Sequence, residues 1–174
     1  MGEAVIGRPE RNEAAPYYFG YIDRIRQENI VAVLEQQLDI ALDYAARMTE
    51  ERSLYRYAPA KWSIREIFSH INDTERLFVF RAMWFARGFP SPLPSFDQDI
   101  AVTAAAADQI PWAGHVEEFR TTRLSTVAFF KNLPLEAWMR QGIASDNPFS
   151  VRALAYITAG HLSHHLAVLD ERYV

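Results

Sequence analysis

Three of the five histidines of the chain lie close together near its C-terminal end, at His161, His164 and His165. The residues around them contain no proline and predict a helix. At about 100° per residue, His161 and His165 lie only about 40° apart on this helix and share its apolar face. Imidazoles spaced i and i+4 can both reach one metal ion at about 2.0 to 2.1 Å. The pair therefore predicts half of a metal site.

A third ligand is predicted on a different helix. His70 lies at the edge of the apolar stripe of a helix expected over Ile64–Arg87, where a side chain can line a cavity between helices. His164 is expected on the flank of its helix, partly exposed, and His115 is expected to face solvent. Spacing alone leaves an alternative open, in which His70, His161 and His165 are separate core residues that each bond to a nearby oxygen.

Carboxylates near these histidines are candidates for moving protons or holding a substrate. Asp73 lies one turn after His70, where it could accept a hydrogen bond from a ligand imidazole or act as a base; a solvated carboxylate on the helix surface is the alternative. Asp97 and Asp99 fall in a long connection that could close over the metal, and Asp97 is the candidate substrate-binding residue.

Two further features limit the chemistry. Glu75 and Arg76 are expected to form a structural ion pair rather than part of a site. The chain has no Cys, which excludes a disulfide framework, a zinc site with thiolate ligands and a Cys nucleophile. It also lacks a G-x-S-x-G elbow, so covalent catalysis by the protein itself is not supported. Any thiol chemistry would need a thiol from outside.

Charge and hydropathy exclude several partners. The chain has 18 Lys and Arg against 22 Asp and Glu, for a net charge of -4, and its basic residues are scattered. This pattern disfavours binding to nucleic acid or to an anionic membrane. No run of 18 apolar residues and no signal-like start occurs, so we expect a cytoplasmic protein without membrane contact.

The length of 174 residues predicts one domain. Residues 1–18 are rich in Gly and Pro and are expected to form an N-terminal arm, with a single domain over 19–174. Apolar periodicity predicts a helix over Ile30–Met48. Ser63 and Glu66 form a capping box that starts the helix over Ile64–Arg87, and Gly88 ends it.

The second half of the chain predicts two more long helices. Residues 88–108 contain three prolines and are expected to cross from one helix to the next. A helix is predicted over Trp112–Asn132, with its stripe at Val116, Phe119, Leu124, Val127 and Phe130. One short turn follows at residues 134–138, and the last helix begins at Ser150. No alternating pattern with hairpin turn signals is present. We therefore predict an all-α four-helix bundle with a long crossing connection between the second and third long helices.

With these residues identified, the sequence resembles the DinB-like (YfiT-like) superfamily of metal-dependent four-helix-bundle proteins. The resemblance extends from about Arg8 to Tyr173 and rests on the segments 57–66 leading to His70, 73–76, 96–97 and 160–165. It implies a bundle that holds a divalent metal, zinc or nickel, through a His of the second helix and the first and last His of an H-x-x-x-H pair. These positions are His70, His161 and His165.

The resemblance also suggests an activity. Similar proteins include thiol-dependent transferases that act with bacillithiol, mycothiol or glutathione, and a maleylpyruvate isomerase. We expect a metal-dependent enzyme that activates water or a low-molecular-weight thiol against a small electrophilic substrate, as a hydrolase or a thiol S-transferase. The alternative is a non-catalytic dimeric bundle that binds a metal or a small molecule. A homodimer is expected mainly from the resemblance.

Overall fold

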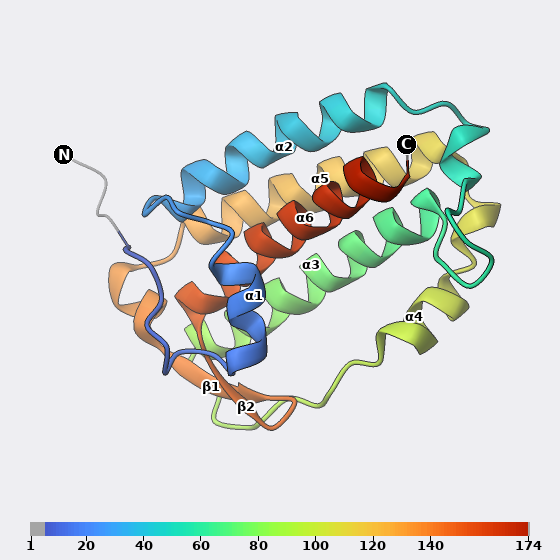
Figure 1. Ribbon diagram of the computed structural model, residues 1–174. Coiled ribbons are helices and arrows are strands. Elements are labelled where there is room, and N and C mark those ends of the chain that lie inside the picture. Colours follow the sequence, from blue (N-terminus) through green and yellow to red (C-terminus); the bar gives the residue numbers. More distant parts are fainter. Residues whose placement is uncertain (1–5, 174) are drawn as a thin grey trace.

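Four long helices run side by side along the molecule in the computed structural model, which describes residues 6–173 (Figure 1). They are α2 (Ile30–Ala46), α3 (Ile64–Ala86), α5 (Trp112–Lys131) and α6 (Val151–Arg172). Helix α6 packs against α3 and α2, and α5 packs against the same two helices. The predicted all-α four-helix bundle is confirmed. Within residues 6–173, none of the helices combines the length and apolar character of a membrane span.

The helix starts follow the capping signals in the sequence. The Ser63 hydroxyl accepts a hydrogen bond from the Glu66 amide at 3.0 Å, and the Glu66 carboxylate accepts one from the Ser63 amide at 2.8 Å. Ser150 caps α6 by accepting from the Ala153 amide at 3.0 Å. These caps satisfy amides that have no partner within the helix, and they fix where each helix begins.

The expectation that the chain forms no hairpin is wrong. Strands β1 (Gln141–Ala144) and β2 (Asn147–Ser150) pair antiparallel directly before α6. The two residues between them, Ser145 and Asp146, both have positive φ, 49° and 59°. This backbone is typical of a type I′ turn, which usually contains Asn-Gly or Asp-Gly. The absence of glycine explains why the turn leaves no clear signal in the sequence.

The crossing between α3 and α5 is present, and it contains a short helix that was not predicted, α4 (Gln98–Ala105). The crossing is tied to the hairpin, because the Leu93 amide donates to the Ile143 carbonyl at 2.9 Å and the Ser145 amide donates to the Leu93 carbonyl at 3.1 Å. A further short helix, α1 (Phe19–Ile22), packs across α6. The first part of the crossing and the hairpin therefore lie together at the end of α3, with α1 on the same side of the molecule, whereas α4 lies toward the start of α3 (Figure 1).

Residues 6–18, within the predicted arm, contact the start of α6. The Glu13 carboxylate is buried, accepts from the Ser150 hydroxyl at 2.6 Å and pairs with the Arg152 guanidinium. Residues 1–5 of the predicted arm lie outside the described residues.

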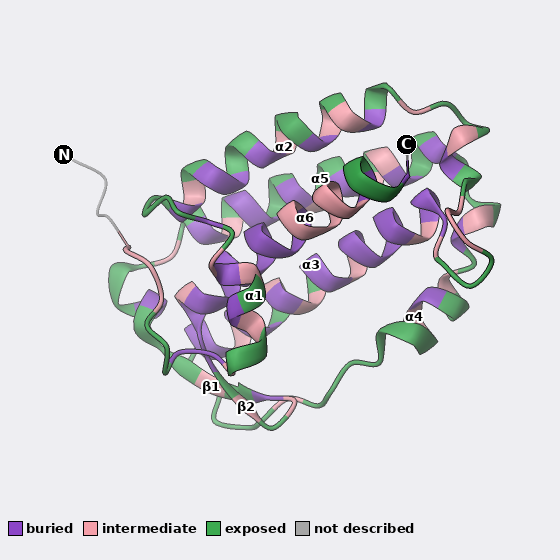
Figure 2. Ribbon diagram, in the orientation of Figure 1, coloured by how far each residue is buried: buried purple, intermediate pink, exposed green. Residues whose placement is uncertain are grey.

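The interior of the bundle contains two apolar clusters with a buried polar layer between them. One cluster lies around the start of α2 and the other around its end, and the same division holds on the three other long helices. Figure 2 shows that the facing sides of these helices are buried. Between the clusters, each long helix contributes polar side chains: Gln37 from α2; His70, Thr74 and Glu75 from α3; Arg123 from α5; and His161 from α6.

Two expectations from the sequence, the ion pair between Glu75 and Arg76 and the core position of Leu124, are wrong. Glu75 pairs with Arg123 and not with Arg76: Nε and Nη2 of Arg123 donate to the two Glu75 oxygens, both at 2.8 Å. Arg123 is fully buried, whereas Leu124, which was expected in the core stripe, is 45 % exposed. A buried carboxylate needs a charged partner, and this need turns the Arg123 face of α5 inward. Arg76 instead pairs with Glu118 at 2.6 Å.

Helix α1 approaches α6 closely at Gly160. A Cβ built on Gly160 would lie 2.1 Å from the Tyr21 carbonyl oxygen and 2.5 Å from its carbonyl carbon. No backbone contact of this length is tolerated, so the short helix can dock here only because residue 160 has no side chain.

We expect Gly160→Ala to lower the free energy of unfolding by about 1 to 3 kcal/mol, because α1 must move away from α6. Urea denaturation measures the change. Gly20→Ala is the matched control, since nothing lies within 4 Å of a Cβ at Gly20. Equal stability of the two variants would show that α1 does not depend on this contact.

Candidate metal centre

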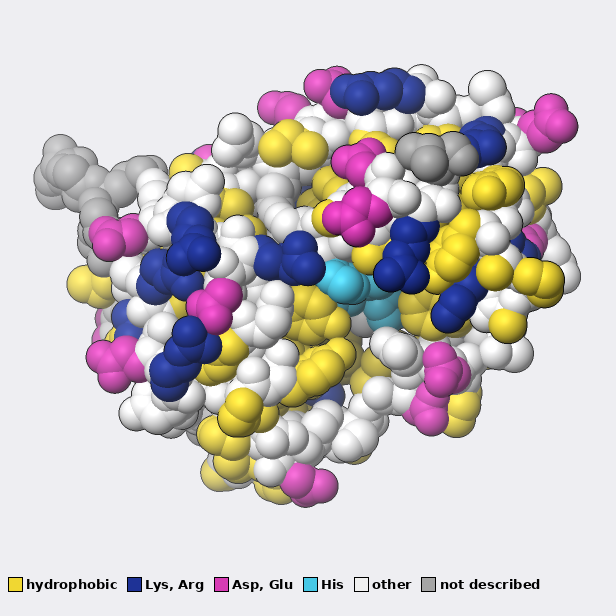
Figure 3. Space-filling view, viewed as in Figure 1, with side chains coloured by type: hydrophobic (Ala, Val, Ile, Leu, Met, Phe, Trp, Pro, Cys, Tyr) yellow, Lys and Arg dark blue, Asp and Glu magenta, His cyan; other side chains and the backbone are white. Residues whose placement is uncertain are grey.

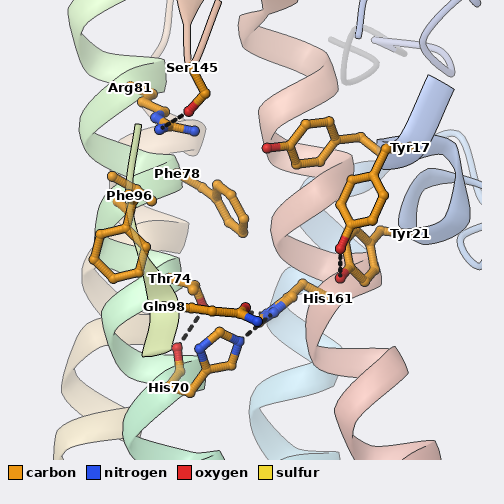
Figure 4. Close-up of a pocket in the computed structure, with 12 residues that line it drawn as sticks. Tyr17, Tyr21, His70, Thr74, Phe78, Arg81, Phe96, Gln98, Ser145 and His161 are labelled. Atoms are coloured by element: carbon orange, nitrogen blue, oxygen red, sulfur yellow. Dashed lines mark hydrogen bonds between the residues drawn. The ribbon is translucent and has the colours of Figure 1, made fainter. Parts of the chain in front are cut away.

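Three histidine side chains meet in the polar layer between α3 and α6. The Nε2 atom of His161 lies 3.1 Å from Nε2 of His70 and 3.1 Å from Nε2 of His165. One nitrogen of each ring falls within 4.8 Å of the others. Three nitrogens around a tetrahedral ion at about 2.0 to 2.1 Å would be separated by about 3.3 Å. The donor set therefore fits a single divalent metal ion, and Figure 4 shows two of its rings, His70 and His161, turned toward each other.

The three rings come together because the two helices that carry them pack along their length. His161 and His165 are one turn apart on α6, as their spacing predicts, and His70 faces them from α3. His161 is also held by aromatic rings on both sides: its ring centroid lies 5.3 Å from that of Tyr21 and 5.8 Å from that of Phe78.

The neighbouring threonine favours the tautomer that can bind a metal. The Thr74 hydroxyl donates to the His70 carbonyl at 2.6 Å, so its oxygen remains free to accept. Nδ1 of His161 lies 3.4 Å from this oxygen. If Nδ1 carries the proton and donates to Thr74, Nε2 of His161 presents its lone pair to the centre of the cluster. A hydrogen bond of this kind orients metal-ligating histidines in general.

Burial keeps these rings uncharged. It lowers the pKa of His70 to about 4, that of His165 to about 3, and that of His161 well below its ordinary value; repulsion from the neighbouring histidines adds to each decrease. The neutral ring is the form that binds a metal. The group of possible ligands found within residues 6–173 contains histidines alone. An ion in this position would therefore keep its full positive charge.

Two cavities border the cluster on different sides. The first is lined by His70 and His161 and encloses about 550 Å³ of space, part of it open to solvent. Its other walls come from α1, α3, the crossing and the hairpin turn (Figure 4). The second cavity, of about 630 Å³, is lined by His165 together with Trp62 and Tyr173. Figure 3 shows histidine side chains at the surface of the molecule, and within the cluster His165 is partly exposed.

The structure does not bring the two candidate carboxylates into the cluster. Asp73 lines neither cavity; its carboxylate lies 3.7 Å from Arg76, and burial raises its pKa while Arg76 opposes the shift. Asp97 caps α4 by accepting from the amides of residues 99 and 100, both at 3.0 Å. Its neighbours Phe96 and Gln98 do line the first cavity. The roles assigned to Asp73 and Asp97 remain predictions.

The expected position of His115 is wrong. It is fully buried, and its Nε2 atom lies 2.9 Å from the Ala107 carbonyl oxygen. Residues of the crossing cover it, and the sequence does not reveal where the crossing returns to the bundle. His164 is half-buried on the flank of α6, as expected, with its ring centroid 5.0 Å from that of His165.

Thr74 and Arg81 are among the residues of the first cavity that were not singled out from the sequence. Thr74 and Arg81 follow His70 by four and eleven positions, which places both within about 40° of it on a helix. Their spacing from His70 therefore predicts that both side chains lie on the same face of the helix as His70, and this signal could have identified them.

Comparison with known proteins defines the class. Residues 34–169 match the model of the DinB superfamily, so the chain belongs to this superfamily. Among solved structures it is similar to YfiT from Bacillus subtilis, with a TM-score of 0.73 and 15 % sequence identity over 95 % of this chain and 91 % of that chain. That protein is described as a probable metal-dependent hydrolase with an unusual four-helix bundle topology. Among curated proteins, no sequence matches this chain significantly.

We expect His161→Ala to reduce bound zinc strongly, because it removes the central nitrogen of the cluster. Loss of a residue that only supports a metal ligand typically lowers metal affinity about 10- to 100-fold, and we expect a larger decrease here. Elemental analysis of protein purified without an affinity tag measures the bound metal. His115→Gln is the control, since it removes a buried histidine outside the cluster. Equal metal content in both variants would contradict the predicted ligand set.

Proposed function

We propose that the protein is a metal-dependent enzyme in which His70, His161 and His165 hold one divalent ion, zinc or nickel. The observation that carries the proposal is the convergence of three neutral Nε2 atoms at the edge of a cavity. Imidazole ligands suit zinc and nickel. Three protein ligands leave a coordination position free, which is typical of catalytic zinc sites and unlike the closed sites that only stabilise a fold.

A divalent ion in such a site makes bound water or a bound thiol more acidic and polarises a carbonyl group. The residues around it have separate tasks. The three uncharged rings donate lone pairs without neutralising the ion, and Thr74 holds His161 in position. Phe78 and Phe96 provide apolar walls that restrict water in the first cavity. These properties support hydrolysis of a small electrophilic substrate as the favoured reaction.

A thiol S-transferase is the second candidate. The chain contains no Cys, so a thiolate would have to come from a low-molecular-weight cosubstrate. The second cavity beside His165, with the aromatic side chains of Tyr57, Trp62 and Tyr173, offers space for such a molecule next to the cluster. A non-catalytic metal-binding or small-molecule-binding bundle is the competing class.

Cobalt substitution distinguishes these possibilities. We expect the visible spectrum of the cobalt-loaded protein to change when acetate or azide is added, because an anion enters the free position. If the protein uses a thiol, glutathione or 2-mercaptoethanol will produce an intense sulfur-to-cobalt band. An unchanged spectrum with every anion and thiol would show a closed site and reclassify the protein as a structural metal-binding bundle.

We also propose a homodimer. Exposed aromatic side chains cluster at the end of α3 and in the following crossing, where the rings of Trp84 and Phe89 stack at 4.2 Å. Phe80 and Phe89 are each nearly half exposed. Apolar surface concentrated in this way is typical of contacts between subunits.

Light scattering should give twice the 20.0 kDa mass of one chain at micromolar concentration. We expect Phe89→Ser to shift the mass toward the monomer and Leu135→Ser, an exposed apolar residue outside this cluster, to leave it unchanged. A mass of 20.0 kDa for the natural chain at all concentrations would exclude the dimer.

A further inference from the structure

The first cavity contains a buried arginine whose charge is not balanced by the protein. Arg81 of α3 is 2 % exposed and lines the cavity together with His70 and His161. Its Nη2 atom donates to the Pro94 carbonyl at 3.1 Å and to the Ser145 hydroxyl at 2.9 Å. Its Nε atom is buried and has no hydrogen-bond partner. Among residues 6–173, no carboxylate forms an ion pair with it.

Other deeply buried arginines differ in this respect. Arg65 and Arg123 are each less than 5 % exposed, and each pairs with a carboxylate, of Glu50 and Glu75 respectively. A buried charge without a counter-charge is strongly destabilising. Burial lowers the pKa of Arg81, but a guanidinium remains charged in proteins. Its neutral partners do not replace an anion.

The cavity places this charge at a distance from the histidine cluster. His70 and Arg81 lie on one face of α3 and are separated by about 16 Å along its axis. Long helical side chains lean toward the helix N-terminus, so the Arg81 guanidinium extends toward His70. Figure 4 shows Arg81 and Ser145 at one end, His70 and His161 at the other, and Phe78 and Phe96 between them.

We propose that Arg81 binds an anionic group, a carboxylate or a phosphate, of the substrate. The bound molecule has an apolar middle that lies between Phe78 and Phe96, and its reacting group is held at the histidine end. The free Nε–H can donate one charge-assisted hydrogen bond to such a group. If an oxygen of the group also replaces Ser145 as the acceptor from Nη2, two oxygens are bound side by side, which fixes the orientation of the molecule. The placement of the reacting group at the histidines rests on the proposed function. The binding of the anionic group requires only Arg81.

A purely structural role for Arg81 makes a different prediction. By bonding to Pro94 and Ser145, the guanidinium also links the crossing to the hairpin turn. If this were its only role, its substitution would lower the melting temperature equally with and without an added anion. If Arg81 binds an anion, its substitution will also reduce the increase in melting temperature that the added anion produces.

Titration of metal-free protein tests the anion site without the metal. Chelator-treated protein is titrated with inorganic phosphate, and separately with acetate, while its melting temperature is recorded. We expect stabilisation by at least one of the two anions, and the preferred one identifies the class of headgroup. The apparent Kd for that anion should rise at least tenfold in Arg81→Gln and be unchanged in Arg87→Gln, which removes the same charge from an exposed position directly after the same helix. Equal affinity in both variants would overturn the proposal.

Arg81→Gln could fail to fold, so a measurement on the natural chain is also needed. In protein labelled with nitrogen-15, the Arg81 Nε–H signal, identified by its loss in Arg81→Lys, should shift on addition of the preferred anion. An Arg81 signal that does not move at a saturating concentration would also overturn the proposal.

Linear dicarboxylates test whether one molecule can span the two ends. In zinc-loaded protein, we expect a dicarboxylate of suitable length, within a series from succinate to sebacate, to bind at least tenfold more tightly than acetate. This gain should disappear in Arg81→Gln. Equal affinity for acetate and every dicarboxylate would contradict a two-ended site.

The two claims fail in distinguishable ways. Retained zinc without any effect of Arg81 on anion binding would refute the anion site and leave the proposed metal centre intact. Anion binding that depends on Arg81, in a protein that does not retain zinc, would refute the metal centre alone.

Discussion

The fold depends on the burial of polar groups across the middle of a helical bundle. Gln37, Glu75, Arg123 and His161 come from four different helices and lie between two apolar clusters. Each group needs a hydrogen-bond partner in the layer, because burial removes it from most of its contact with water. Arg123 meets this need with Glu75, and its Nη1 atom also donates to the side-chain oxygen Oε1 of Gln37 at 3.0 Å. These bonds fix the helices relative to one another, and they thereby fix the positions of the histidines.

The histidines are the members of this layer that the protein satisfies least. Nε2 of His161 lies 3.1 Å from Nε2 of His70 and from Nε2 of His165. It carries either one proton or one lone pair, so it can form a well-directed hydrogen bond with only one of these two rings. A divalent metal ion bound as proposed would resolve the conflict, because each ring could donate its lone pair to the ion. The same reasoning applies at the other end of the cavity, where the buried Nε–H of Arg81 lacks an acceptor. These features at the two ends of one cavity support the proposed sites for a metal ion and for an anion.

The sequence predicted those features that depend on local signals. Ser63 with Glu66 and Ser150 marked the helix starts, and the i, i+4 spacing placed His161 and His165 on one face. The features that it missed depend on contacts between distant segments. The hairpin uses a turn without glycine, His115 is buried by the returning crossing, and Arg123 faces inward only because Glu75 lies opposite. Such contacts are determined by packing and leave little trace in periodicity.

The central claim is that His70, His161 and His165 together hold one divalent ion. Anomalous diffraction from crystals of zinc-loaded protein, collected on both sides of the zinc absorption edge, tests it most directly. We predict a single strong peak at about 2.0 to 2.1 Å from Nε2 of each of the three rings, with non-protein density completing the coordination. A peak at other residues, or a fourth ligand supplied by the protein at this site, would contradict an open three-histidine centre.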